Sequence, residues 1–201
     1  MQRYNASTAL IVVDVQNDFA DPKGSLSVKG AEALIPLINL EVRRAKSSGS
    51  VVVATQDWHP ESTPHFKKDG GIWPVHCVGG TWGAELHPDL VLPDDVHTVH
   101  KGANGEDGYS GFTMRDPTTG NEMPTALDGV LRKRDTKRVV VAGLATDYCV
   151  QATALDAARL GYESAVLVDA CAAVDLQSGD GDRALETMRD SGVAIWSTRM
   201  R

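Results

Sequence analysis

Ala9-Leu-Ile-Val-Val-Asp14-Val15 is a run of apolar residues that is interrupted only by Asp14. Similar short runs, rich in β-branched residues, recur at residues 50–55, 96–100, 138–143, 162–169 and 193–196. Most of them are continuous apolar strings rather than alternating ones, which is typical of parallel strands buried on both faces of a sheet. The sequence therefore predicts a six-stranded, mostly parallel sheet.

Helical patterns lie between several of these runs. Apolar residues at steps of three and four over residues 31–45 predict a helix that ends near Gly49. Shorter stripes cover residues 150–158, before Gly161, and residues 184–188, before Gly192. Strand, helix, strand order favours right-handed parallel units, so we expect an α/β fold, a three-layer α/β/α sandwich, in a single domain spanning residues 1–201.

Composition limits the classes of protein that the chain can represent. It has 201 residues, of which 42% are hydrophobic, and 20 basic against 27 acidic side chains give a net charge of −7. Such a composition excludes intrinsic disorder, and the negative balance argues against nucleic acid or an anionic membrane as a partner. Three widely spaced cysteines suit free thiols in a reducing compartment, and the first apolar run is too short for a signal peptide or a membrane span. We therefore expect a cytoplasmic protein.

Reactive side chains gather where the predicted strands end. Asp14, Asp57 and Lys101 each follow a strand, and the run 143–149 leads from another strand to Cys149. In open parallel sheets, ligands bind at the carboxyl ends of the strands. Two long irregular stretches, residues 56–95 and 101–122, begin at the same edge, and loops of that length are usually functional. We therefore expect the functional site there.

Cys149 lies where the predicted helix over residues 150–158 begins. Thr146 or Asp147 could cap that helix, and the helix N-terminus and Lys101 would both lower the pKa of the thiol. Asp14 lies inside or directly after a buried strand, so its carboxylate needs a partner, and Lys101 is the nearest candidate. A buried cysteine that only packs, and a purely structural ion pair between Asp14 and Lys101, are the alternatives.

A second cluster combines one carboxylate with three imidazoles, all within 20 residues: Asp57, His59, His65 and His76. This mixed oxygen and nitrogen set suits one divalent ion, Zn, Fe or Mn, although ordinary loop histidines would give the same pattern. Nearby aromatic residues could line a flat apolar pocket, or could simply pack in the core or in a lid. They are Phe19, Trp58, Trp73 and Tyr109.

Five ordered blocks of sequence carry a more specific signal. They are residues 12–19 (VVDVQNDF), residues 55–59 (TQDWH) with His65, residues 73–77 (WPVHC), residues 101–102 (KG) and residues 143–150 (GLATDYCV). Together they resemble the nicotinamidase/pyrazinamidase branch of the isochorismatase-like cysteine hydrolases, and the resemblance spans residues 9–196.

The resemblance implies roles for individual residues. Cys149 would be the nucleophile, Asp14 the general base and later acid, and Lys101 the residue that holds the thiolate and the carboxylate in place. One divalent metal would be bound by four side chains: Asp57, His59, His65 and His76. The substrate pocket would include Phe19 and Trp73, which would sandwich a pyridine ring, and Tyr109. A cis peptide bond between Leu144 and Ala145 would turn the backbone N–H groups of Ala145 and Cys149 toward the oxyanion.

The same resemblance implies an activity. We expect an amidohydrolase that converts nicotinamide, and also pyrazinamide, to the acid and ammonia through a cysteine thioester, in NAD salvage. The alternatives are another hydrolase of this superfamily, acting on an N-carbamoyl or ureido compound or on isochorismate, and a non-catalytic metal-binding or protein-interaction module. Members of the family often form dimers or larger assemblies, so a homo-oligomer is also expected.

Overall fold

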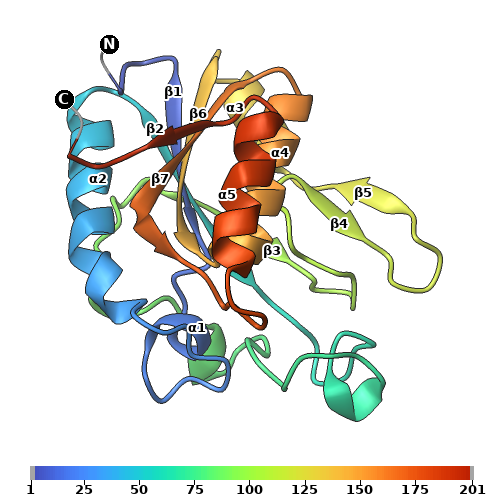
Figure 1. Cartoon of the computed structure of the whole chain (residues 1–201). Coiled ribbons are helices and arrows are strands. Elements are labelled where there is room, and N and C mark those ends of the chain that lie inside the picture. The colour runs from blue at the N-terminus through green and yellow to red at the C-terminus, as the bar shows by residue number, and fades with distance from the viewer. Residues whose placement is uncertain (1–2, 200–201) are drawn as a thin grey trace.

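A six-stranded parallel sheet forms the centre of the computed structural model, which describes residues 3–199 (Figure 1). Its strand order is β3-β2-β1-β6-β7-β8, and every neighbouring pair is parallel. The strands are β1 (Thr8–Val13), β2 (Val51–Asp57), β3 (His97–Lys101), β6 (Arg138–Leu144), β7 (Glu163–Ala172) and β8 (Ala194–Trp196). The prediction of six strands in a largely parallel sheet is confirmed.

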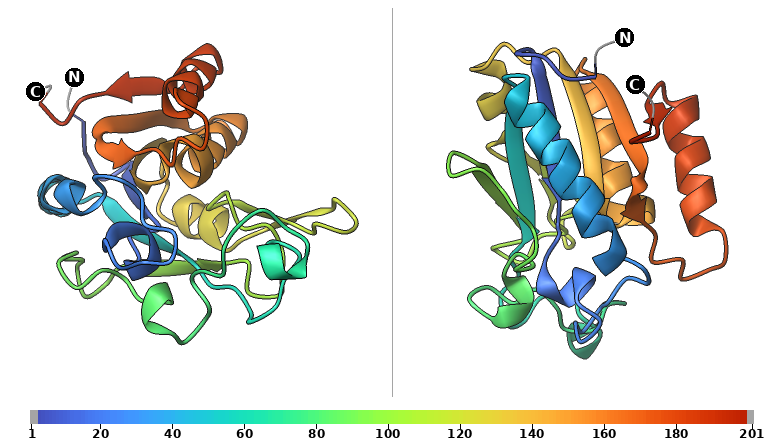
Figure 2. Two further views of the ribbon diagram at one scale, coloured as in Figure 1. Left: turned by 60° about the horizontal axis from the view of Figure 1, so that its bottom comes forward. Right: turned by 90° about the vertical axis from the view of Figure 1, so that its left-hand side faces the viewer.

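Helices cover both faces of this sheet. One face carries α2 (Ile35–Ser47), which has Pro36 in its first turn, and the other carries α4 (Gln151–Arg159) and α5 (Asp180–Asp190) (Figure 2). The remaining helical segments are α1 (Asn17–Ala20), α3 (Leu127–Arg132), three short 3₁₀ turns (Glu32–Leu34, Lys67–Asp69 and Trp82–Ala84) and a π-helical turn (Thr146–Val150). The α/β/α sandwich is therefore present as predicted.

The central strand β1 explains why the decisive run of sequence is continuously apolar. Leu10 and Val12 pack in the hydrophobic cluster that contains the buried face of α2. Ala9, Ile11 and Val13 pack in the opposite cluster, with buried residues of α3, α4 and α5. Because successive side chains of a strand point to opposite faces, a strand between two helical layers needs an apolar residue at every position.

One element was missed in the sequence. The stretch 101–122, expected to be irregular, leads into an antiparallel hairpin of β4 (Thr113–Arg115) and β5 (Glu122–Pro124), which protrudes from the body of the molecule (Figure 1). Both strands are three residues long and largely exposed, so the sequence has no apolar run there from which they could be predicted. Such short strands depend on pairing rather than on burial.

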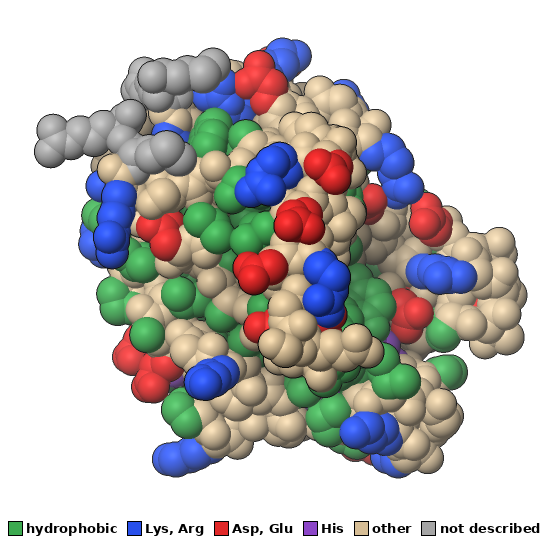
Figure 3. Space-filling view, in the orientation of Figure 1, with side chains coloured by type: hydrophobic (Ala, Val, Ile, Leu, Met, Phe, Trp, Pro, Cys, Tyr) green, Lys and Arg blue, Asp and Glu red, His purple; other side chains and the backbone are tan. Residues whose placement is uncertain are grey.

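The surface agrees with the composition. On the face shown in Figure 3, basic and acidic side chains are interspersed, with no continuous basic stripe of the kind that a phosphate backbone would need. Among residues 3–199, no helix has the length and apolar character that a membrane crossing requires.

Candidate active site

Asp14, Asp57 and Lys101 meet at the carboxyl end of the sheet. Lys101 Nζ lies 2.7 Å from Asp14 Oδ2 and 2.7 Å from Asp57 Oδ1, and the side chains of Asp14 and Lys101 are wholly buried. The register of β2 and β3 sets Asp57 beside Lys101, whereas Asp14 follows β1 with a positive φ of 49°. The other oxygen of Asp14, Oδ1, accepts a 2.6 Å hydrogen bond from the hydroxyl of Thr55.

Cys149 joins this group from the π-helical turn that follows β6. Its Sγ and one carboxylate oxygen each of Asp14 and Asp57 lie within 4.8 Å of one another, and the thiol shares a hydrogen bond with Asp14. The predicted N-cap is wrong, because no side chain caps this turn. The carboxylate of Asp147 instead accepts hydrogen bonds from the backbone N–H groups of Val174 and Asp175.

Burial decides the protonation of this cluster. It raises the pKa of Asp14 from 3.8 to about 6, against the opposing effect of the Lys101 charge. It also raises the pKa of the Cys149 thiol well above its usual value, and Lys101 only partly offsets this. The expected lowering of the Cys149 pKa is therefore wrong. Cys149 is therefore a neutral thiol, and the carboxylate of Asp14 beside it can accept its proton.

In Lys101 and Asp57, by contrast, the neighbouring charges outweigh burial, and both pKa values shift in favour of the charged form. Burial disfavours the charged form of Lys101, but the carboxylates of Asp14 and Asp57 outweigh it and hold the pKa of the ammonium well above its usual value. Burial likewise opposes ionisation of Asp57, yet Lys101 and the nearby imidazoles keep the pKa of that carboxyl below its usual range. Asp57 and Lys101 therefore form a stable ion pair beside the thiol.

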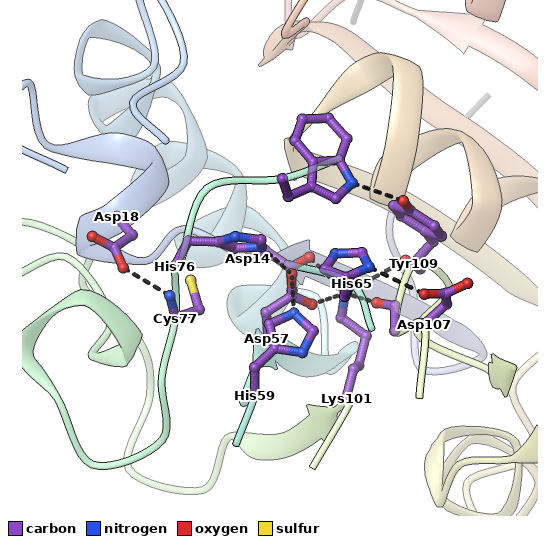
Figure 4. Close-up of polar contacts among 12 residues, drawn as sticks. Asp14, Asp18, Asp57, His59, His65, His76, Cys77, Lys101, Asp107 and Tyr109 are labelled. Carbon is purple, nitrogen blue, oxygen red and sulfur yellow. Dashed lines mark hydrogen bonds and ion pairs between the residues drawn. The ribbon is translucent and has the colours of Figure 1, made fainter. Parts of the chain in front are cut away.

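Three imidazoles lie around Asp57 (Figure 4). His59, His65 and His76 are buried, and each offers one ring nitrogen within 4.8 Å of the other two. Asp57 Oδ2 lies 3.6 Å from His59 Nε2 and 3.9 Å from His76 Nε2. Burial lowers the pKa of His76 to about 4, so this ring is neutral and can act as a ligand.

The hydrogen bonds of these rings test whether the group suits a metal. His65 Nδ1 is 3.1 Å from Asp107 Oδ1, and His76 Nδ1 is 2.8 Å from the carbonyl of Pro74. Because both partners are acceptors, each Nδ1 carries the proton and each Nε2 keeps a free lone pair. Neither ring nitrogen of the buried His59 has a hydrogen-bond partner among the described residues. These residues fit a divalent cation, as expected for three imidazoles and a carboxylate.

A small apolar cavity opens onto both groups. Phe19, Trp73 and Tyr109 line it as expected, whereas Trp58 does not and instead stacks on His100, with 4.3 Å between ring centroids. The Trp73 indole N–H donates a 2.9 Å hydrogen bond to the Tyr109 hydroxyl. The lining also includes Asp57, His65, His76, Ala145 and Cys149, together with Leu26, Val28, Leu144, Tyr148 and Val174. The peptide bond between Leu144 and Ala145 is cis.

Two contributors were not found in the sequence. Thr55 fixes Asp14, and although it begins the block TQDWH and lies near the end of a predicted strand, neither assigned it a role. Asp107 binds His65, although it lies in a glycine-rich and acidic stretch where nothing distinguishes it from Glu106. Both act through tertiary contacts, which spacing along the chain does not encode.

Comparison with known proteins gives a consistent picture. Residues 8–200 match the isochorismatase domain family. The chain is 40% identical to a nicotinamidase of Acinetobacter baylyi over 208 aligned residues, which cover 95% of this chain and 92% of that protein. It is 42% identical to the nicotinamidase/pyrazinamidase of Mycobacterium tuberculosis over 190 residues, which cover 93% and 97% of the two chains.

A solved structure is similar as well. The pyrazinamidase of Pyrococcus horikoshii, in complex with zinc, superimposes with a TM-score of 0.84 at 42% identity, covering 95% of this chain and 99% of that one. The family match spans nearly the whole chain and includes the residues of all five blocks of sequence. The chain belongs to the isochorismatase family.

Proposed function

We propose that this protein is a nicotinamidase, which hydrolyses nicotinamide to nicotinate and ammonia with Cys149 as the nucleophile, and that it also accepts pyrazinamide. The observation that carries the proposal is that a buried thiol, a carboxylate and an ammonium meet at one end of a cavity lined by aromatic rings. The sequence similarity to nicotinamidases supports the choice of substrate.

The first half of the reaction makes a thioester and releases ammonia. Asp14 accepts the proton of the Cys149 thiol as sulfur attacks the amide carbonyl carbon, so a thiolate is needed only during the attack. The backbone N–H groups of Ala145 and Cys149 stabilise the oxyanion. Asp14 then returns the proton to the amide nitrogen, the carbon–nitrogen bond breaks and ammonia leaves. A carboxyl group whose pKa is about 6 can both accept and return this proton near neutral pH.

The second half regenerates the thiol. Asp14 takes a proton from water, the resulting hydroxide attacks the thioester carbon, and the carbon–sulfur bond breaks to release nicotinic acid, which ionises to nicotinate and a proton in solution. The proton on Asp14 then returns to the sulfur of Cys149. Throughout, Lys101 Nζ stays between Asp14 and Asp57, where its charge stabilises the anionic forms of Asp14 and of the sulfur.

The remaining residues bind and orient the substrate. Phe19 and Trp73 hold the ring between them, and Tyr109 closes the wall beside Trp73. Asp57, His59, His65 and His76 would hold a divalent cation, which when bound would supply a Lewis acid for the ring nitrogen of the substrate. Zn, Fe and Mn all accept this set of ligands.

A small panel of amides tests the proposal. Reduced, zinc-loaded protein should release ammonia from nicotinamide and pyrazinamide, and far less from benzamide, which lacks the ring nitrogen. No ammonia from any pyridine or pyrazine amide would contradict it. Release from an N-carbamoyl amino acid instead, or loss of isochorismate, would assign the protein to another activity of the superfamily.

A further inference from the structure

Three consecutive residues of the loop after β3 contact three different parts of the site. The carboxylate of Asp107 binds His65, the carbonyl of Gly108 accepts a hydrogen bond from Lys101 Nζ, and the hydroxyl of Tyr109 accepts one from Trp73. The loop approaches Lys101 so closely that a Cβ at position 108 would lie 2.8 Å from the Cβ of Lys101. The position of this loop is therefore tied to the imidazoles, the lysine and the pocket together.

Hydrogen bonds to β4 fix the backbone of Asp107. Its N–H donates a 2.7 Å hydrogen bond to the carbonyl of Arg115 in β4, and its carbonyl accepts one of 3.1 Å from the N–H of Arg115. The protruding hairpin thus anchors the backbone of Asp107, and its carboxylate reaches the edge of the His65 ring (Figure 4). The Asp107 side chain is 25% exposed, against 6% for His65.

We propose that Asp107 is a positioning residue of the metal site, which acts by fixing the ring orientation and tautomer of His65. The inference rests on the metal site of the proposed function. A carboxylate can only accept a hydrogen bond, so its contact with Nδ1 keeps the proton on that nitrogen and leaves the Nε2 lone pair free for a cation shared with His59 and His76. Its negative charge also makes the imidazole a stronger donor to a cation.

The chain offers a matched control on the same loop. Glu106 is also acidic, but its carboxylate binds the backbone and side-chain amides of Asn104, and no contact with a histidine is described for it. Glu106→Gln therefore removes the same charge from the loop without touching His65. A loss of Zn²⁺ affinity caused only by net charge would appear in both variants.

The test measures the Kd of Zn²⁺ by competition with a chromophoric chelator, using metal-free protein and no substrate. Asp107→Ala should weaken Zn²⁺ binding by about 10- to 100-fold, the usual effect of losing such a partner. Asp107→Asn keeps an acceptor but not the charge, so its Kd should lie between those of wild type and Asp107→Ala. Glu106→Gln should bind Zn²⁺ as wild type does. Equal affinities for Asp107→Ala and Glu106→Gln would overturn the proposal.

A double-mutant cycle with His65 separates positioning from a general structural role. In a His65→Ala background, Asp107→Ala should change the Kd of Zn²⁺ by less than about twofold, since the ring on which it acts is gone. A loss as large as in the wild-type background would also overturn the proposal. None of these measurements uses turnover, so they keep their meaning if the substrate proves not to be nicotinamide.

Discussion

The site has two corners that are built in different ways. The thiol corner, Asp14, Lys101 and Cys149, follows the ends of three strands of the central sheet, and its side chains are buried and paired. The imidazole corner, His59, His65 and His76, comes from the long loop between β2 and β3. Asp57 stands between the corners, 2.7 Å from Lys101 Nζ and 3.6 Å from His59 Nε2.

This difference indicates what each corner needs. The thiol corner is complete without a ligand, because each charge has an opposite charge or a hydrogen-bond donor beside it. The imidazole corner has a buried ring, His59, whose two nitrogens have no hydrogen-bond partner among residues 3–199, as expected of a ring that would bind a cation. We therefore propose that the first corner carries the chemistry and the second orients the substrate, and the following changes should separate them.

The largest effect is expected from Cys149→Ala. Turnover should fall by at least about 1,000-fold, as for the loss of other nucleophiles, because no other described thiol lines the cavity. Zn²⁺ affinity should stay that of wild type, which chelator competition measures. Cys171→Ala is the control and should keep its activity. A Cys149→Ala protein that still turns over would place the chemistry in the imidazole corner.

Lys101→Met should damage both corners. It leaves the buried carboxylates of Asp14 and Asp57 without their shared cation, and breaking a buried pair costs about 3–5 kcal/mol of unfolding free energy. Urea denaturation measures this loss. The exposed pair of Lys46 with Asp95 gives the control, since Lys46→Met should cost less than about 1 kcal/mol. Equal losses for the two variants would show that Lys101 contributes no more than a surface charge.

His59→Ala should break the imidazole corner alone. We expect loss of Zn²⁺ from the purified protein and a KM for nicotinamide about 10- to 100-fold higher, whereas alkylation of Cys149 by iodoacetamide should keep its rate. His100→Ala, which removes a ring stacked on Trp58 outside the cavity, should change none of these. Full Zn²⁺ content in His59→Ala would contradict the assignment of this ring.

The acid limb of the pH profile reports on Asp14. Because burial raises the pKa of Asp14 to about 6, this carboxyl becomes protonated as pH falls below 6 and can no longer accept the thiol proton. kcat/KM should therefore fall about fivefold between pH 6 and pH 5, and about tenfold per pH unit below that. In Thr55→Val the carboxylate loses a hydrogen bond that favours its charged form, so the limb should move to higher pH. A limb near pH 4 in wild type would contradict this role.

The smallest effect is expected from Tyr109→Phe. The change removes the hydrogen bond between the Trp73 indole and the Tyr109 hydroxyl, which is worth about 1 kcal/mol. KM should rise about fivefold with kcat nearly unchanged, and steady-state kinetics on nicotinamide would show it. A fall in kcat alone would mean that Tyr109 acts on the reacting atoms rather than on the pocket wall.

The thiol corner was easier to predict from the sequence than its surroundings, for a physical reason. Strand ends can be read from apolar runs, and parallel strands bring their carboxyl ends to one edge, so Asp14, Lys101 and Cys149 could be expected together. The sheet and its two helical layers follow from the same periodicity. The family resemblance added the ligand set and the pocket residues, which spacing alone left open.

What could not be predicted depends on burial and on contacts between distant segments. The Cys149 pKa was expected to be low because Lys101 and a helix end were weighed without the desolvation that dominates. Thr146 or Asp147 was expected to cap the helix that forms α4, which has no side-chain cap, and loop residues after β7 instead offer Asp147 two N–H groups. Asp107 reaches His65 only because the hairpin at Arg115 fixes its backbone.

The central claim is that the reaction proceeds through a thioester on Cys149. Trapping with hydroxylamine is its most direct test. Zinc-loaded wild-type protein should convert nicotinamide to both nicotinate and nicotinohydroxamic acid when hydroxylamine is present. Water and hydroxylamine both attack the thioester, so each gives its own product. Mass spectrometry of acid-quenched protein should find the nicotinoyl group on the peptide that contains Cys149. Nicotinate as the sole product, with Cys149 never acylated during turnover, would contradict the claim and assign the attack to water.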